Sequence, residues 1–120
     1  AGAIIIGKVA TVEYAFGGWG SNETTAAPVN PWDKKQHRVP GGSSSGSGVS
    51  VASGLVPGAL GTDTGGSVRV PAAFCGLWGM RPSHGAISLD GVMPFAPMKA
   101  MSTRIEPRVR TACSPLPWLS

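Results

Sequence analysis

The first hydrophobic block of the chain is the aliphatic run GAIIIGKV at residues 2–9, which is bounded by glycines. A short β-branched run between turn residues is typical of a strand buried on both faces of a sheet. The next apolar positions, in TVEYAF at residues 11–16, are too few to distinguish a strand from a short helix with Thr11 as N-cap. We therefore expect a buried strand followed by one short element.

A polar stretch without a sustained period follows at residues 17–42. Its repeated Gly and Pro residues predict a long structured loop, with Trp19 and Trp32 as candidates to anchor it. Long loops in compact domains often carry function.

Small residues dominate the next stretch, SGSGVSVASGLV at residues 45–56. Gly and Ser are poor helix formers in isolation, so a helix here needs close packing against a sheet, with a serine as N-cap. The later patterns predict a strand over 57–62, a tight turn over 63–67, and a helical or irregular segment limited by Pro71 over 68–76. One or two more strands are expected from the segments 77–83 and 86–92. This alternation favours an α/β layered fold with partly parallel strands.

Charge is unevenly distributed along the chain. Residues 1–97 carry six Lys or Arg and five Asp or Glu, whereas residues 98–120 carry four basic residues and one acidic residue. The net charge of +4 therefore belongs mostly to the tail and does not indicate nucleic-acid binding by the main body. Because the tail is basic, contains proline and lacks an apolar period, we expect residues 98–120 to lie outside a domain formed by residues 1–97.

The two cysteines, Cys75 and Cys113, give neither a disulfide framework nor a metal-ligand spacing. A reducing compartment is the simplest interpretation, and no apolar run is long enough to span a bilayer. We expect a cytoplasmic protein with no bound metal and no membrane partner.

The turn GTDTGGS at residues 61–67 is the first candidate for chemistry. If it joins a strand to a helix, the backbone N–H groups of Thr64, Gly65, Gly66 and Ser67 converge on one point, where they can bind an anion or an oxyanion. Ser67 can be a nucleophile if a base removes its proton. The simpler alternative is a glycine-rich turn in which Ser67 only caps a helix.

Two other motifs, a phosphate-binding loop and a nucleophile elbow, are not supported by the sequence around them. No phosphate-binding loop is present, because the third glycine of a G-x-G-x-x-G motif beginning at Gly46 is replaced by Val51. GSSSG at residues 42–46 matches a nucleophile elbow centred on Ser44, with Asp63 and His84 following in order. That elbow needs a preceding strand, whereas KKQHRVP precedes it.

Taken together, the two Gly/Ser clusters are far more specific. The stretch PGGSSSGSGVSVASGLVPGALGTDTGGSVRVPAAFCGLWGMRPSHGAIS closely resembles the signature segment of the amidase signature family of hydrolases. The resemblance extends over about residues 2–97. It implies a partial α/β/α layered fold with a mixed sheet, truncated at both ends, and no cofactor.

The resemblance also implies a Ser-Ser-Lys triad that forms an acyl-enzyme. Ser67 would be the nucleophile, and Ser43, after a cis peptide bond, would relay protons between Ser67 and a lysine. The oxyanion hole would fall on the backbone of Thr64, Gly65, Gly66 and Ser67. Asp63 and Arg69, which flank the nucleophile, would brace the loop rather than act chemically.

The sequence departs from the family in one catalytic residue, the lysine that acts as the base. The family's catalytic lysine belongs farther upstream than the residues that precede Ser43 here, and Lys8, Lys34 and Lys35 are interpreted as surface lysines. Since residue 1 is not Met, we expect a piece of a longer protein that is inactive alone, although its parent would hydrolyse amides.

The expected ligand is a small carboxamide, with no nucleic acid bound directly, and a homodimer of the full-length parent is left open. Two alternatives remain. One is the amidase subunit of a tRNA-dependent amidotransferase, which would hydrolyse glutamine. The other is a non-catalytic remnant or binding module.

Overall fold

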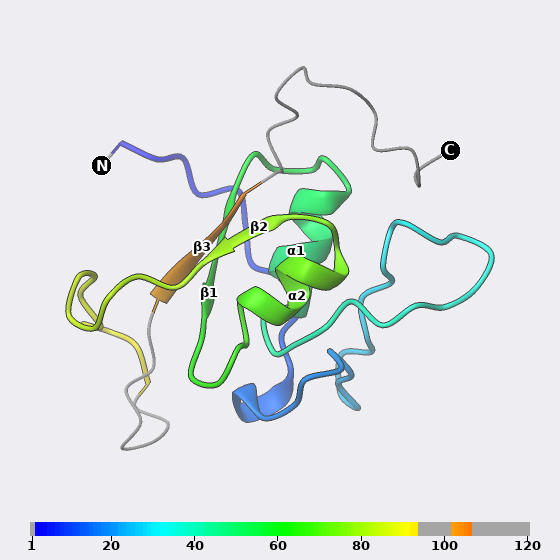
Figure 1. Ribbon diagram of the computed structural model, residues 1–120, viewed down its shortest axis with the longest axis horizontal. Coiled ribbons are helices and arrows are strands. Elements are labelled where there is room, and N and C mark those ends of the chain that lie inside the picture. The colour runs from blue at the N-terminus through cyan, green and yellow to red at the C-terminus, as the bar shows by residue number, and fades with distance from the viewer. Residues whose placement is uncertain (1, 94–101, 107–120) are drawn as a thin grey trace.

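The computed structural model describes residues 2–93 and 102–106 of the chain. Its elements are the 3₁₀-helix η1 (Glu13–Ala15), the helices α1 (Ser45–Ala52) and α2 (Arg69–Phe74), and the strands β1 (Ala59–Thr62), β2 (Trp78–Met80) and β3 (Ser102–Glu106) (Figure 1). Among the described residues, no helix has the length and apolar character needed to cross a membrane.

The three strands form one sheet in the order β1-β3-β2, and β3 is antiparallel to both neighbours. Strands β1 and β2 consequently run in the same direction, and α2 lies between them in the sequence. The register places Ile105 opposite both Ala59 and Gly79. All pairings among the described strands are therefore antiparallel, although β1 and β2 share the parallel orientation expected of neighbours in an α/β fold.

Helices α1 and α2 contact each other and lie against one face of this sheet (Figure 1). Val51 of α1 and Val68, which precedes α2, are buried together, with Val56, Ala59 and Leu77 packed around them. Two glycines allow the close approach. A Cβ at Gly61 would lie 2.8 Å from Val68 Cγ2, and one at Gly79 would lie 2.6 Å from Ala72 Cβ.

The small-residue composition of α1 follows from the same close packing. The helix forms as expected but ends at Ala52, and six of its eight residues are buried. A Cβ at Gly48 would lie 3.2 Å from Pro71 Cβ. Pro71 is the third residue of α2, within the first turn, where no intrahelical bond needs its missing N–H.

Two expected strands are absent from the described residues. Residues 2–9 adopt no regular structure, and Ile4, Ile5 and Ile6 are 86%, 90% and 75% exposed. Because a strand needs a ladder partner, the aliphatic run does not form one where no described strand lies beside it. Residues 86–92 likewise form turns, with bonds from Ala86 N–H to Ser83 O and from Val92 N–H to Leu89 O.

We expected residues 98–120 to lie outside the fold, but one segment of this range belongs to the sheet. Strand β3, within that range, is the central strand of the sheet. Its sequence STRIE places β-branched residues at alternate positions 103 and 105, a pattern too short to stand out from the polar tail. Residues 98–101 and 107–120 lie outside the described residues.

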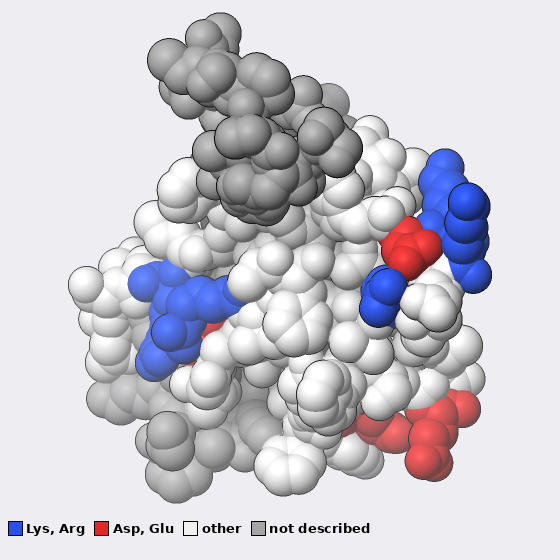
Figure 2. Space-filling model, turned by 45° about the vertical axis from the view of Figure 1, so that its right-hand side comes forward, with Lys and Arg blue, Asp and Glu red and all other residues white. Residues whose placement is uncertain are grey.

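The segment 17–42 contains no helix or strand, as expected. Trp32 anchors it, because its Nε1–H donates to Cys75 O at 2.6 Å, and Asn30 Nδ2 donates to Phe74 O at 3.0 Å. Trp19 is as exposed as Trp32, but its indole makes no hydrogen bond to a described residue, so it does not anchor the loop in this way. Figure 2 shows that basic side chains on one face gather in separate groups, with uncharged surface between them.

Candidate active site

The two Gly/Ser clusters of the sequence meet in the structure. Ser43 and Ser44 precede α1, and the turn at residues 63–67 joins β1 to α2. The Ser44 N–H donates to Ser67 O at 3.0 Å, so the clusters are in direct contact. The peptide bond between Gly42 and Ser43 is cis, as the resemblance implied.

Ser43 is buried and held by its neighbours on the N-terminal side. Its carbonyl accepts the Val12 N–H at 2.9 Å, and the preceding Gly42 N–H donates to Gly18 O at 2.8 Å. Thr11 does not cap η1, which follows Val12 without a side-chain cap. Instead, the segment before η1 lies against Ser43.

Asp63 organises the turn that carries Ser67. Its side chain is fully buried and accepts the backbone N–H groups of Gly66 at 2.8 Å, Val68 at 3.2 Å and Arg69 at 3.3 Å. The Arg69 guanidinium adds bonds of 3.0 Å and 3.1 Å. Burial alone would raise the pKa of Asp63, but the bonds from Arg69 and Val68 outweigh it and hold the pKa below its usual value. Asp63 and Arg69 thus make the contacts that a bracing role requires.

One of the four expected oxyanion donors is already engaged. The Gly66 N–H bonds to Asp63 Oδ1, whereas the N–H groups of Thr64, Gly65 and Ser67 have no hydrogen-bond partner among the described residues. A Cβ at Gly65 would meet nothing within 4 Å. Of the predicted nest, the N–H groups of Thr64, Gly65 and Ser67 therefore stay free of described partners.

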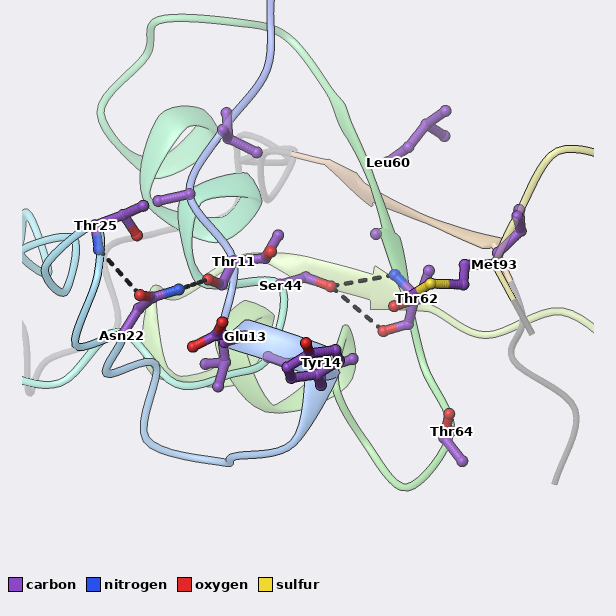
Figure 3. A pocket seen from close by; sticks show the side chains of 17 residues that line it. Thr11, Glu13, Tyr14, Asn22, Thr25, Ser44, Leu60, Thr62, Thr64 and Met93 are labelled. Carbon is purple, nitrogen blue, oxygen red and sulfur yellow. Dashed lines mark hydrogen bonds between the residues drawn. The ribbon is translucent and has the colours of Figure 1, made fainter. Parts of the chain in front are cut away.

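A cavity of about 630 Å³ lies beside these residues (Figure 3). Ser43, Ser44 and Thr64 contribute to its wall, while Ser67 is not among its lining residues. The wall is mainly apolar and is completed by Val9–Ala15, Asn22, Thr25, Leu60–Thr62, Val92 and Met93. Among the described residues of this lining, Glu13 is the one acidic residue, and none is Lys, Arg or His.

Two features of this wall were not predicted from the sequence. Asn22 Nδ2 donates to Thr11 O at 2.7 Å, and its Oδ1 accepts the N–H groups of Thr24 and Thr25, which ties the turn at residues 22–25 to the segment before η1 (Figure 3). The signal was present in NETT, since Asn bonding to N–H groups two or three residues later is a common turn. The second feature is a left-handed backbone at Tyr14 and Ala15, with φ of 52° and 54°.

The remaining sequence candidates lie elsewhere. Lys8, Lys34 and Lys35 are exposed, and none of them lines the cavity. No strand precedes Ser44 in the described chain, so the nucleophile elbow is not formed. The part of the chain that the structure describes contains no group of three or more His, Cys, Asp or Glu side chains suited to a metal ion.

Comparison with known protein families identifies the family of this chain. The family model described as Amidase matches residues 1–111. The chain belongs to the amidase family. The α/β fold class and the family predicted from the two Gly/Ser clusters are thereby confirmed.

Amidase relatives match most of the chain. A glutamyl-tRNA(Gln) amidotransferase subunit of Coxiella burnetii is 54% identical over 96 residues, 80% of the chain and 20% of that protein. A 2-amino-5-chloromuconic acid deaminase of Comamonas testosteroni is 50% identical over 93 residues, 78% of the chain and 20% of that protein. A crystal structure of an amidase superposes with a TM-score of 0.83 at 41% identity, covering 92% of the chain and 25% of the solved chain. The chain spans about a fifth of the length of the curated relatives it matches.

Proposed function

We propose that this chain carries the serine pair of an amide hydrolase, with Ser67 as nucleophile and Ser43 as proton relay. The observation that carries the proposal is the direct bond between the two signature clusters, from Ser44 N–H to Ser67 O at 3.0 Å. Membership of the amidase family supports the same chemistry.

In the proposed reaction, Ser67 Oγ attacks the carbonyl carbon of a carboxamide. The carbonyl oxygen gains negative charge, which the N–H groups of Thr64, Gly65 and Ser67 would stabilise. The C–N bond then breaks, the amine leaves with a proton passed through Ser43, and an acyl ester remains on Ser67. Water attacks the ester, the acid leaves, and Ser67 regains its proton.

The base that ends this relay is a neutral lysine, which no lysine in the described residues supplies at the cavity. Removing one member of a catalytic triad leaves only the residual effect of binding and the oxyanion hole. We therefore propose that the chain alone turns over amides very slowly or not at all.

We propose a small carboxamide as the substrate, in the cytoplasm and without a cofactor. The cavity offers an apolar wall with hydroxyl groups at Ser43, Thr62 and Thr64, which suits an uncharged amide. The second candidate is glutamine hydrolysis within an amidotransferase, favoured by the identity to the glutamyl-tRNA(Gln) amidotransferase protein of Coxiella burnetii.

Covalent labelling tests the proposal. Purified chain is treated with a fluorophosphonate, and the adduct is located by peptide mass spectrometry. We expect an adduct on Ser67 that is absent from Ser67→Ala and retained in Ser53→Ala, since Ser53 is an exposed serine beyond α1. No adduct in a folded chain would support the non-catalytic alternative.

An amide turnover assay on the same samples tests whether the chain contains a catalytic base. Hydrolysis of aryl amides that Ser67→Ala abolishes would contradict the proposed inactivity of the chain, because it would show that a base is present within these 120 residues.

A further inference from the structure

The hydroxyl of Ser44 does not cap helix α1 but bonds to strand β1. Ser44 is the N-cap residue of this helix, yet its side chain makes no capping bond. Instead, Ser44 Oγ accepts the Thr62 N–H at 3.1 Å and donates to Thr62 O at 3.3 Å (Figure 3). The side chain is 2% exposed, so water does not replace these bonds.

The backbone of Ser44 makes a contact at the other end of the same turn. Its N–H donates to Ser67 O at 3.0 Å. Thr62 and Ser67 are the residues on either side of the segment 63–66. A single residue, covalently attached to Ser43, therefore holds both ends of the turn that carries Ser67.

This contact is distinct from the bracing by Asp63. The Asp63 carboxylate bonds to N–H groups within the turn and at the start of α2, and so fixes the internal shape of the turn. Within this turn Ser44 bonds only to the two ends, Thr62 and Ser67, so it fixes where the turn lies relative to Ser43. Space around it is restricted, because even a Cβ at Gly61 would lie 2.5 Å from Ser44 Oγ.

We propose that Ser44 is a positioning residue that sets the placement of Ser67 relative to Ser43. The catalytic meaning of this placement rests on the proposed function, because proton transfer between the two serines needs hydrogen-bond distance. The placement itself is a property of the fold and can be measured separately.

Ser47 provides a matched control. It is equally buried, at 1% exposure, and its hydroxyl donates to Leu60 O at 2.6 Å, on the same strand β1. Ser47→Ala therefore removes a buried bond between α1 and β1 without touching the turn.

The experiment compares Ser44→Ala and Ser47→Ala by urea unfolding and by hydrogen exchange of single amides. The Ser44 N–H reports docking of the turn through Ser67 O, and the Gly66 N–H reports its internal shape through Asp63. In Ser44→Ala we expect exchange of the residue-44 amide to rise at least tenfold beyond the change expected from global stability, while Gly66 is unaffected. In Ser47→Ala both amides should follow global stability only.

Fluorophosphonate labelling of Ser67 adds a chemical measurement. We expect the labelling rate to fall at least tenfold in Ser44→Ala and to change less than twofold in Ser47→Ala. Ser44→Cys, which keeps the side-chain shape with a somewhat larger atom and forms only weak hydrogen bonds, repeats the comparison if the alanine variant does not fold.

The proposal is overturned if the two variants give the same exchange pattern, or if Gly66 loses protection together with residue 44. Absence of labelling in the unsubstituted chain would instead count against the proposed function, and the exchange comparison would then decide the role of Ser44 alone.

Discussion

At the scale of single residues, Asp63 contributes more to the site than its non-catalytic position suggests. Five hydrogen bonds converge on one buried carboxylate, three from backbone N–H groups and two from Arg69. Hydrogen bonds to an ionised group are stronger than those between neutral groups. Asp63 therefore fixes the turn, and it also engages the Gly66 N–H, one of the four donors of the predicted oxyanion nest.

Asp63→Asn tests this contribution. The amide loses the charge that Arg69 pairs with, and its NH₂ group faces backbone donors, so we expect the free energy of unfolding to fall by about 2 to 4 kcal/mol. Urea unfolding measures the change. Asp33→Asn is the control, because Asp33 pairs with Arg38 in an exposed loop and should contribute much less. Equal losses in both variants would contradict the bracing role.

The same pair predicts a pH dependence. The pKa of Asp63 in the folded chain lies below its ordinary value of 3.8, so the ionised form stabilises the fold at neutral pH. That stabilisation is lost as the pH falls through the lowered pKa. The difference in unfolding free energy between the unsubstituted chain and Asp63→Asn should therefore shrink below about pH 4.

At the scale of elements, glycines decide how closely the helices approach the sheet. Gly61 in β1 faces Ser44 and Val68, Gly79 in β2 faces Val68 and α2, and a side chain at either position would overlap its neighbours. Since alternate residues of a strand point to opposite faces, the larger side chains Leu60, Trp78 and Met80 lie on the other face. The helix-facing side of the sheet is thus built from small residues.

Gly79→Ala should destabilise the contact between β2 and α2. The added Cβ would lie 2.6 Å from Ala72 Cβ and 3.1 Å from Val68 O, so we expect a loss of about 1 to 3 kcal/mol in thermal or urea unfolding. Gly18→Ala is the matched control, because a Cβ there meets nothing within 4 Å. An unchanged stability in Gly79→Ala would show that the helix can move away without cost.

At the scale of the whole molecule, helices α1 and α2 cover one face of the sheet, and no described helix covers the other. Leu60, Trp78 and Met80 are 71%, 62% and 60% exposed on the face away from the helices. Exposed apolar surface on a sheet promotes association. The chain spans about a fifth of the length of the curated relatives it matches. Self-association through this face is therefore tested on the purified chain.

Replacing Trp78 and Met80 together by Thr should reduce self-association of the purified chain. Threonine keeps the β propensity of the strand while removing apolar area, so the midpoint of urea unfolding should change little. Sedimentation velocity measures the association. Trp19→Thr is the control, because Trp19 is equally exposed but lies in the long loop. Similar effects of the two replacements would show that the sheet face is not responsible.

The sequence by itself predicted the elements whose residues leave few alternatives. Helix α1, strand β1 and strand β2 form within the ranges that the small-residue and apolar patterns indicated. The glycines and serines of α1 and the single glycine of each strand suit close contact between helix and sheet. The family and the two serines Ser43 and Ser67 were also predicted from the sequence, since the spacing of two Gly/Ser clusters is far more specific than either cluster alone. Their catalytic roles stay predictions.

Tertiary structure decided what depends on partners distant in the sequence. The aliphatic run at residues 2–9 has every local property of a buried strand, yet Ile5 is 90% exposed because no described strand pairs with it. Conversely, residues 102–106 carry a weak local pattern and become the central strand, because β1 and β2 both offer them hydrogen bonds. The bonds of Ser44 to Thr62 and Ser67 are decided in the same way. A sequence states what each residue can bond to, and only the fold determines which partner is within reach.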